Sequence, residues 1–147
     1  MNNPTVIGIY GKSNTGKTML LTKIVKELNL ETFKIATVKI TDKKIGIDKK
    51  GKDTEKHSRA GADLVVFSTN SETDYLIKKK SSIQDIIQNI LSLGDFDLIL
   101  IEGANDKETL KIRIGNADER PNTKLTFDDN FEEIIKFIKS QISMGKI

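Results

Sequence analysis

Apolar and polar positions along the chain alternate in a way that predicts strands and helices in turn. Val6–Tyr10 is a short apolar run of strand-forming residues that leads into a glycine-containing segment. From Lys17 to Leu28, leucine, isoleucine and valine recur at helical spacing, which predicts an amphipathic helix. Phe33–Ile40 alternates and is β-branched, so it predicts a second strand.

The same alternation continues after a long polar segment, Thr41–Lys56. We expect further strands over Asp63–Ser68, Tyr75–Lys79, Phe96–Ile101 and Leu110–Ile114, and helices over Thr54–Ala60, Ser82–Leu93 and Phe131–Ile142. Asp128, Asp129 and Asn130 offer an N-cap to the last helix. Phe96–Ile101 is nearly all apolar, as in a strand buried on both faces of a parallel sheet. The order predicts one α/β domain over residues 1–147, with a mostly parallel sheet and helices on both faces.

The loop after the first strand carries the clearest chemical signal. Gly11 to Thr18 read GKSNTGKT and match G-x-x-x-x-G-K-[ST] at every fixed position. The glycines let consecutive N–H groups converge on phosphate oxygens, and the following helix points the positive end of its dipole at the same anion. The motif requires a strand before it and a helix after it, and both are predicted here.

This motif predicts a three-layer P-loop NTPase fold that holds a nucleoside triphosphate and Mg²⁺. We expect Lys17 to reach the β- and γ-phosphates and the Thr18 hydroxyl to ligate Mg²⁺. The expected nucleotide contacts are Gly11, Lys12, Ser13, Asn14, Thr15, Gly16, Lys17, Thr18 and Met19. Lys12 also fits a P-loop variant whose extra lysine reaches the nucleotide of a partner subunit. An exposed loop lysine is the alternative.

A bound Mg²⁺ needs a carboxylate at the tip of a neighbouring strand. Glu102 directly follows the apolar run Phe96–Ile101, whereas Asp97 stands at the start of that run and so at the opposite end of the sheet. Asp48 and Asp53, in the long polar segment, could also bind Mg²⁺ or orient a water, or be ordinary solvated aspartates. The expected catalytic residues are Lys17, Glu102 and Asp48, and the expected metal ligands are Thr18, Glu102 and Asp48.

Composition narrows the remaining classes of function. The chain has 147 residues, 37% of them hydrophobic and 31% charged, which is a soluble globular balance. No apolar run reaches the roughly 18–20 residues that span a bilayer, and the first residues lack a signal-peptide pattern. Cysteine is absent and His57 is the only histidine, which excludes thiolate sites and histidine metal clusters. These absences favour the cytoplasm.

Lysine gives the chain a net charge of +3 and a pI of about 9.0. The lysines gather between Lys39 and Lys56 and again at Lys78 to Lys80. A solvated lysine-rich surface is one interpretation, and an anionic partner such as a phosphorylated small molecule is another. Few aromatic residues interleave with these lysines, which argues against a nucleic acid partner.

Three segments together resemble the family of molybdopterin-guanine dinucleotide biosynthesis protein B, MobB. They are GKSNTGKT, the segment GIDKKGKDTEKHSRAGAD after TVKI, and DLILIEG. The resemblance covers roughly Thr5 to Gly103 and implies a GTP-binding, weakly hydrolytic homodimer. It also implies that the protein assists a partner guanylyltransferase that joins GMP to molybdopterin. GTP and Mg²⁺ are then the expected cofactors, with Asp48 and Glu102 on the metal side.

The chain departs from the family's pattern in two places. After Lys39 the family carries K-H-x-H-H-x-F, and this chain has Ile40, Asp42, Lys43 and Ile45 at the corresponding positions. The family's E-G-F-K becomes Glu102-Gly103-Ala104-Asn105. The first departure removes every histidine of that stretch. If those histidines contact molybdopterin or a metal in the family, the segment from Thr41 to Lys56 binds that ligand differently or not at all.

Two other classes of protein fit the same motif. One is a nucleotide-dependent dimeric switch or partitioning-type ATPase that uses Lys12, and the other is a small-molecule kinase. Against the kinase, no general base is identifiable and no arginine-rich lid is present. No N-K-x-D segment marks guanine specificity, so the residues alone leave GTP versus ATP open. Neither a glutamine nor an arginine finger is obvious near the γ-phosphate, so we expect slow hydrolysis.

Overall fold

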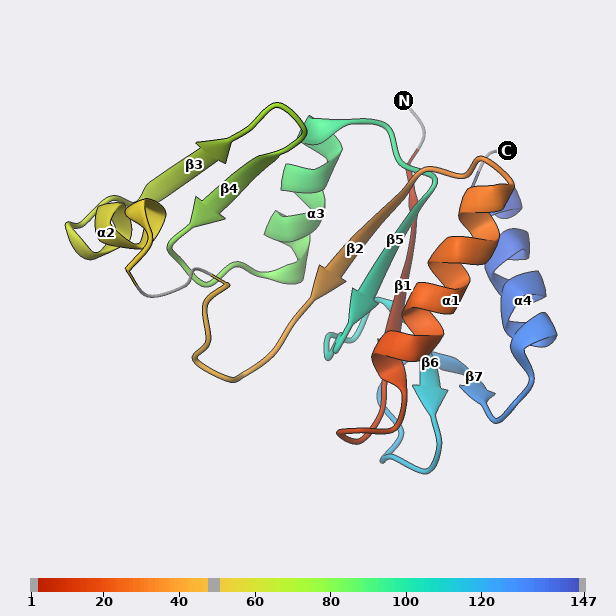
Figure 1. The fold of residues 1–147 in the computed structure, drawn as a ribbon. Helices are drawn as coiled ribbons and strands as arrows, with labels where there is room; N and C mark the ends of the chain where they lie inside the picture. Colours follow the sequence, from red (N-terminus) through yellow and green to blue (C-terminus); the bar gives the residue numbers. More distant parts are fainter. Residues whose placement is uncertain (1–2, 48–50, 146–147) are drawn as a thin grey trace. The chain divides into compact units, whose positions relative to one another are not determined.

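The computed structural model describes residues 3–47 and 51–145 and divides the chain into two compact units (Figure 1). One unit comprises Met1–Thr41 together with Ile83–Ile147, and the other comprises Asp42–Ser82. That the two units act as one domain stays a prediction.

The larger unit is built on a five-stranded sheet. In sheet order its strands are β2 (Ile35–Lys39), β5 (Leu98–Glu102), β1 (Thr5–Tyr10), β6 (Leu110–Ile114) and β7 (Thr123–Phe127). Every neighbouring pair is parallel, which confirms the predicted parallel sheet. Parallel strands place their carboxyl ends at one edge, where ligands of open α/β sheets bind. Ile9 of β1 is in register with Glu102 of β5, so the end of β1 and Glu102 lie together at this edge.

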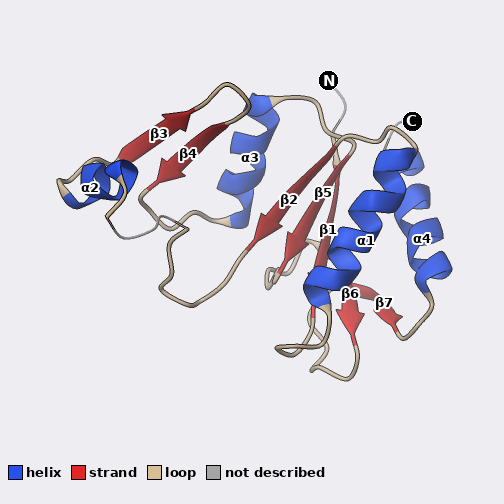
Figure 2. Ribbon diagram, viewed as in Figure 1, coloured by secondary structure: helices blue, strands red, loops and turns tan. Residues whose placement is uncertain are grey.

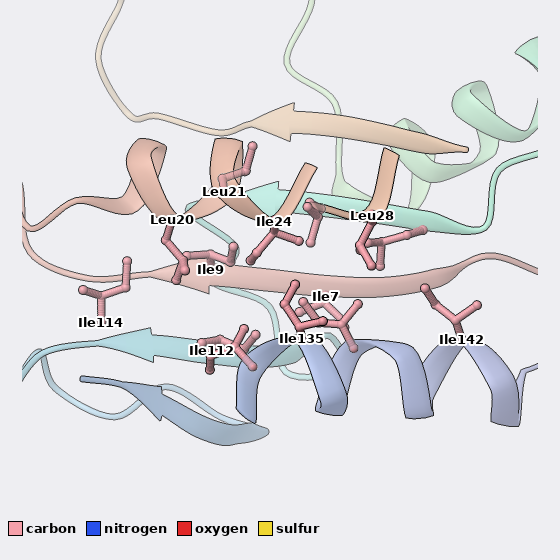
Figure 3. Close-up of a cluster of buried hydrophobic side chains, with 14 residues drawn as sticks. Ile7, Ile9, Leu20, Leu21, Ile24, Leu28, Ile112, Ile114, Ile135 and Ile142 are labelled. Carbon is pink, nitrogen blue, oxygen red and sulfur yellow. The ribbon is translucent and has the colours of Figure 1, made fainter. Parts of the chain in front are cut away.

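Helices cover both faces of this sheet, as the sequence predicts (Figure 2). On one face, α1 (Lys17–Leu30) and α4 (Phe131–Met144) pack against apolar side chains of β1, β5 and β6 (Figure 3). On the other face, α3 (Ile83–Leu93) packs against Ile99 and Ile101. Successive residues of β5 thus enter opposite cores, and all five are buried. This two-sided burial explains why the sequence of β5 is almost continuously apolar.

The strand β7 is the element of this sheet that the sequence analysis missed. Its sequence, TKLTF, has only Leu125 and Phe127 as large apolar residues. Its pairing with β6 shifts in register between Lys111 and Ile112. Because β7 is an edge strand with few apolar residues, its sequence gives a weak strand signal.

The expected helix cap before α4 has a different form in the structure. Asn130 occupies the N-cap position, but its side chain makes no capping hydrogen bond. Its amide instead donates to the Thr126 carbonyl at 3.0 Å and to Glu133 Oε2 at 3.2 Å. Asn130 therefore ties the end of β7 to the first turn of α4.

The smaller unit contains α2 (Asp53–Arg59), β3 (Leu64–Ser68) and β4 (Thr73–Ile77). The two strands pair with each other in an antiparallel hairpin and form a sheet of their own. The sequence predicts each of these three elements, but it does not show that the two strands stay apart from the parallel sheet. Across both described ranges, 3–47 and 51–145, no helix is long and apolar enough to cross a membrane.

One glycine brings the segment after β5 close to the start of the P-loop. A Cβ added to Gly8 would lie 2.7 Å from the Cβ of Ala104, a distance that real Cβ atoms essentially never show. Ala104 is fully buried, so it has no room to move away. Glycine at this position of β1 therefore lets the chain beyond Glu102 pass directly over the strand that carries the P-loop.

Candidate functional site

The loop between β1 and α1 encloses the carboxyl end of β1. Gly16, the N-cap of α1, has a left-handed conformation with φ of 91°, and Asn14 also has a positive φ, of 61°. The Thr15 hydroxyl donates to the Lys12 carbonyl at 2.6 Å and closes the loop. Alternating backbone handedness of this kind forms a concavity of N–H groups that binds anions. The predicted motif thus has the backbone form that its chemistry requires.

Lys17 lies at the mouth of this concavity. Its Nζ donates to the Gly11 carbonyl at 3.1 Å, and its side chain is half-buried. The first turn of α1 contains no acidic residue, so no side chain of that turn competes with an anion for the helix dipole. Ser13, Thr18 and Met19 are exposed beside it, and Met19 is 75% exposed.

Thr18 and Glu102 meet at the edge of the sheet. The Thr18 hydroxyl lies 3.3 Å from each carboxylate oxygen of Glu102, and Glu102 is only 8% exposed. Lys39 Nζ approaches Glu102 Oε1 to 3.9 Å from β2. Hydroxyl and carboxylate oxygens are ligands that Mg²⁺ prefers. The predicted pair of metal ligands is therefore brought together by the fold.

The backbone around Glu102 fixes the position of its carboxylate. Gly103 N donates to the Ile9 carbonyl and Ile40 N donates to the Glu102 carbonyl, both at 2.9 Å. Gly103 has a φ of +93°, and a Cβ there would lie 2.5 Å from the Ile40 carbonyl oxygen. Glycine is thus needed where the chain turns away from β5, between β1 and β2.

The other predicted site residues lie elsewhere. Asp97 is at the opposite edge of the sheet, as expected, and accepts a hydrogen bond from Lys34 N at 2.8 Å. Asp53 and His57 lie in α2 of the smaller unit. Asp48 lies outside the described residues.

The donor set around the P-loop fits Mg²⁺ that is bound together with phosphate. Within 3–47 and 51–145, no cluster of three or more histidines, aspartates and glutamates could hold a metal ion on its own. Mg²⁺ is commonly bound by only one or two carboxylates, with substrate phosphates and waters as further ligands. Thr18 and Glu102 would supply the protein side of such a site.

Two loops beside the P-loop are held by buried polar contacts that the sequence analysis did not identify. Lys111 of β6 is fully buried, and its ammonium donates to three carbonyls. The acceptors are Asp106 O at 2.5 Å, Thr109 O at 2.9 Å and Pro121 O at 2.8 Å. A buried ammonium is tolerated only when it is paired and hydrogen-bonded in this way. Lys111 therefore joins the loop before β6 to the loop after it.

A carboxylate accompanies this buried ammonium. Asp106 Oδ1 lies 3.8 Å from Lys111 Nζ, and Asp106 Oδ2 accepts from the Thr109 hydroxyl at 2.7 Å and from Thr109 N at 3.0 Å. Burial raises the pKa of Asp106, but the hydrogen bonds from Thr109 and the charge of Lys111 outweigh it. The net pKa of Asp106 therefore lies below its ordinary value, which favours its charged carboxylate form.

Arg120 fastens the second loop to the strand that carries the P-loop. Arg120 N donates to the Tyr10 hydroxyl at 3.0 Å, and Arg120 Nη1 donates to the Ala104 carbonyl at 2.8 Å. The Arg120 guanidinium carbon lies 4.8 Å from the centre of the Tyr10 ring. The Tyr10 hydroxyl also shares a hydrogen bond of 2.6 Å with the Thr123 hydroxyl. Tyr10, the residue before Gly11, thus contacts both Arg120 and Thr123 and anchors the loop after β6 to β1.

A pocket with a volume of about 460 Å³ opens beside the start of the P-loop. Its walls come from residues 10–12, Asn105 and residues 117–121. It adjoins the phosphate concavity at Gly11 and Lys12, and the anchored loops form its other sides.

Residues 6–140 match the family described as Molybdopterin guanine dinucleotide synthesis protein B, MobB. The match continues well past Gly103, the limit of the resemblance in the sequence analysis.

Proteins named for this pathway align with the chain over most of its length. A Methanocaldococcus jannaschii protein is 39% identical over 109 residues. Its name describes it, provisionally, as a molybdopterin-guanine dinucleotide biosynthesis adapter protein. Adapter proteins of the same name from Haemophilus influenzae and Escherichia coli are 28% and 30% identical over 114 residues. The alignments cover 72%, 76% and 74% of this chain but 42%, 64% and 65% of those relatives, respectively.

Solved structures share the fold. A crystal structure of molybdopterin-guanine biosynthesis protein B superposes with a TM-score of 0.68 at 25% identity and covers 94% of this chain and 99% of its own. Bacillus subtilis MobB superposes with a TM-score of 0.73 at 17% identity, over 93% of this chain and 97% of its own.

The burial of the Lys111 ammonium leads to a prediction about the free energy of unfolding. Lys111→Met would leave three carbonyls and the Asp106 carboxylate without their cation, so we expect a loss of about 3 kcal/mol or more in the free energy of unfolding. Urea denaturation followed by circular dichroism measures it. Lys107→Met, at an exposed lysine of the same loop, should change stability by about 0.5 kcal/mol or less. Equal stability of the two variants would show that the Lys111 contacts do not hold these loops.

Proposed function

Because the chain belongs to the MobB family of molybdopterin guanine dinucleotide synthesis proteins, we propose that it binds GTP and Mg²⁺ at its P-loop and assists the guanylylation of molybdopterin. The observation that carries the nucleotide part is the meeting of Thr18 and Glu102, at 3.3 Å, beside a loop with anion-binding backbone conformations.

Each residue of the site has a distinct part in this proposal. The N–H groups of the loop and the dipole of α1 hold the phosphates. Lys17, whose ammonium now rests on the Gly11 carbonyl, turns to the β- and γ-phosphate oxygens. Thr18 and Glu102 hold Mg²⁺, which offsets phosphate charge when it is bound. Asp48 stays our candidate for a further group on the metal side, and hydrolysis by the protein alone is slow.

The names of the relatives support guanine rather than adenine as the base of the bound nucleotide. The names from Haemophilus influenzae and Escherichia coli specify a guanine dinucleotide and an adapter role. We therefore propose GTP as the nucleotide and a molybdopterin guanylyltransferase as the partner enzyme. The expected setting is the cytoplasm.

The nucleotide claim is tested by Lys17→Ala. Loss of the ammonium removes charge-assisted hydrogen bonds to two phosphates, so we expect GTP affinity to fall about 100-fold or more. Isothermal titration calorimetry with GTP, ATP and GDP in the presence of Mg²⁺ measures this effect and the base preference. Lys26→Ala, at an exposed lysine on the same helix, is the matched control and should bind as the parent does.

Two results would contradict the proposal in different ways. An unchanged GTP affinity in Lys17→Ala would rule out the P-loop as the nucleotide site. A preference of the parent protein for ATP would reject the cofactor role and favour the partitioning-type ATPase.

The proposal includes a homodimer in which Lys12 contacts the partner's nucleotide. The Lys12 side chain is exposed, while its carbonyl is used within the loop by Thr15. Lys12→Ala should therefore abolish nucleotide-dependent dimerisation in analytical ultracentrifugation and change GTP affinity of the monomer by about two-fold or less. Dimerisation that persists in Lys12→Ala would show that Lys12 is an ordinary exposed lysine.

A further inference from the structure

Lys39, the last residue of β2, presents its ammonium beside the carboxylate of Glu102. The two residues are Cα partners in the parallel pairing of β2 with β5, and Ile40 N continues this pairing by donating to the Glu102 carbonyl at 2.9 Å. Paired residues of neighbouring strands point to the same face of a sheet. Ile35 and Leu100 are in phase with this pair and contribute to the core beneath α1. The Lys39 and Glu102 side chains therefore lie on the face of the sheet that α1 covers.

The contact between these two side chains is too loose to fix the ammonium in place. Lys39 Nζ lies 3.9 Å from Glu102 Oε1, beyond the ~2.7–2.9 Å of a charge-assisted hydrogen bond. The Lys39 side chain is 65% exposed, whereas that of Glu102 is 10% exposed. Exposed ion pairs contribute little to stability, because water screens them and a long side chain loses freedom in them. The fold therefore holds the carboxylate, while the ammonium can leave it for a stronger anion.

Lys39 and Lys17 approach Glu102 from opposite sides. The strand order β2-β5-β1 places β5 between the strand that ends in Lys39 and the strand that leads into the P-loop (Figure 2). Lys17 belongs to the P-loop side, where its Nζ donates to the Gly11 carbonyl at 3.1 Å. A phosphate chain that begins in the loop and extends to Glu102 therefore has one lysine on its inner side and the other beyond its end.

Mg²⁺ on Thr18 and Glu102 changes the partner that suits Lys39. In P-loop proteins the metal bridges β- and γ-phosphate oxygens, so the γ-phosphate is the group that comes next to the carboxylate. A divalent cation on Glu102 repels an ammonium that rests on the same carboxylate. The γ-phosphate oxygens are strong anionic acceptors for that ammonium. A nucleoside diphosphate lacks this group and leaves Lys39 without a phosphate to pair with.

We propose that Lys39 contacts the terminal phosphate of the bound nucleotide and makes the site prefer GTP to GDP. In the unliganded protein its ammonium rests on Glu102, as that of Lys17 rests on the Gly11 carbonyl. The inference rests on the proposed function, because it takes the P-loop as the nucleotide site. It assigns to the end of β2 the distinction between triphosphate and diphosphate, which the loop N–H groups alone do not make.

The ratio of GTP affinity to GDP affinity tests the inference. Both affinities are measured by isothermal titration calorimetry with Mg²⁺, in the parent protein and in Lys39→Met. The variant should bind GTP about ten-fold more weakly, the size of one lost charge-assisted hydrogen bond. Its GDP affinity should stay within about two-fold of the parent's, since Lys39 has no phosphate partner in that complex. The preference for GTP should therefore fall by about the same ten-fold.

Two further variants separate the position of the charge from its presence. Lys34→Met removes an exposed lysine just before β2, at the opposite edge of the sheet beside Asp97, and should keep the parent's ratio. Lys39→Arg keeps a cation at the end of β2 that also binds phosphate, so it should restore most of the preference. Circular dichroism checks that all three variants fold.

A parent without a preference for GTP over GDP overturns the inference, and so does an equal ratio in the parent and in Lys39→Met. If both affinities of Lys39→Met fall together, Lys39 only supports the Glu102 carboxylate, and the proposed nucleotide function still stands. Failure of the proposed function looks different. In that case the parent binds neither GTP nor GDP, and the role of Lys39 falls with it.

Discussion

The parallel pairing of β1 with β5 is the constraint on which the rest of the site depends. It puts Ile9 in register with Glu102, so that the strand that leads into the P-loop and the strand that supplies the carboxylate end together. The Thr18 hydroxyl then meets the Glu102 oxygens at 3.3 Å across the edge of the sheet. A slip of one residue would turn the Glu102 side chain to the other face of the sheet and separate the pair.

Around this pairing, a second set of interactions positions the loops at the same edge. Gly8 lets Ala104 pass over β1, and Arg120 bonds to the Ala104 carbonyl while its guanidinium covers Tyr10. The fully buried Lys111 joins the loops before and after β6 through carbonyl oxygens. The buried charge is expensive to desolvate, and its contacts with Asp106 and three carbonyls compensate for that. The phosphate concavity and the neighbouring pocket thus share one rigid support.

The sequence predicts the parts of the site that local pattern determines. The P-loop pattern and the apolar run before Glu102 sufficed to place Thr18 and Glu102 at one edge, because the α/β alternation predicts parallel strands and parallel strands end at the same edge of a sheet. Lys111 could not be predicted, since a lysine within LKIRI reads as the solvent-facing side of a strand. Its burial depends on carbonyls up to ten residues away, which no local pattern encodes. The separate pairing of β3 with β4 escaped prediction for the same reason, whereas β7 was missed because its own sequence has few apolar residues.

The central claim is that Glu102 and Thr18 form the protein side of a Mg²⁺ site for a nucleotide on the P-loop. The most direct test is the gain in GTP affinity when Mg²⁺ is added, measured by calorimetry in the parent protein and in Glu102→Gln. The account predicts that Mg²⁺ strengthens GTP binding by about ten-fold or more in the parent and by about two-fold or less in Glu102→Gln. An equal gain in both proteins would contradict it, because Glu102 would then take no part in holding the metal.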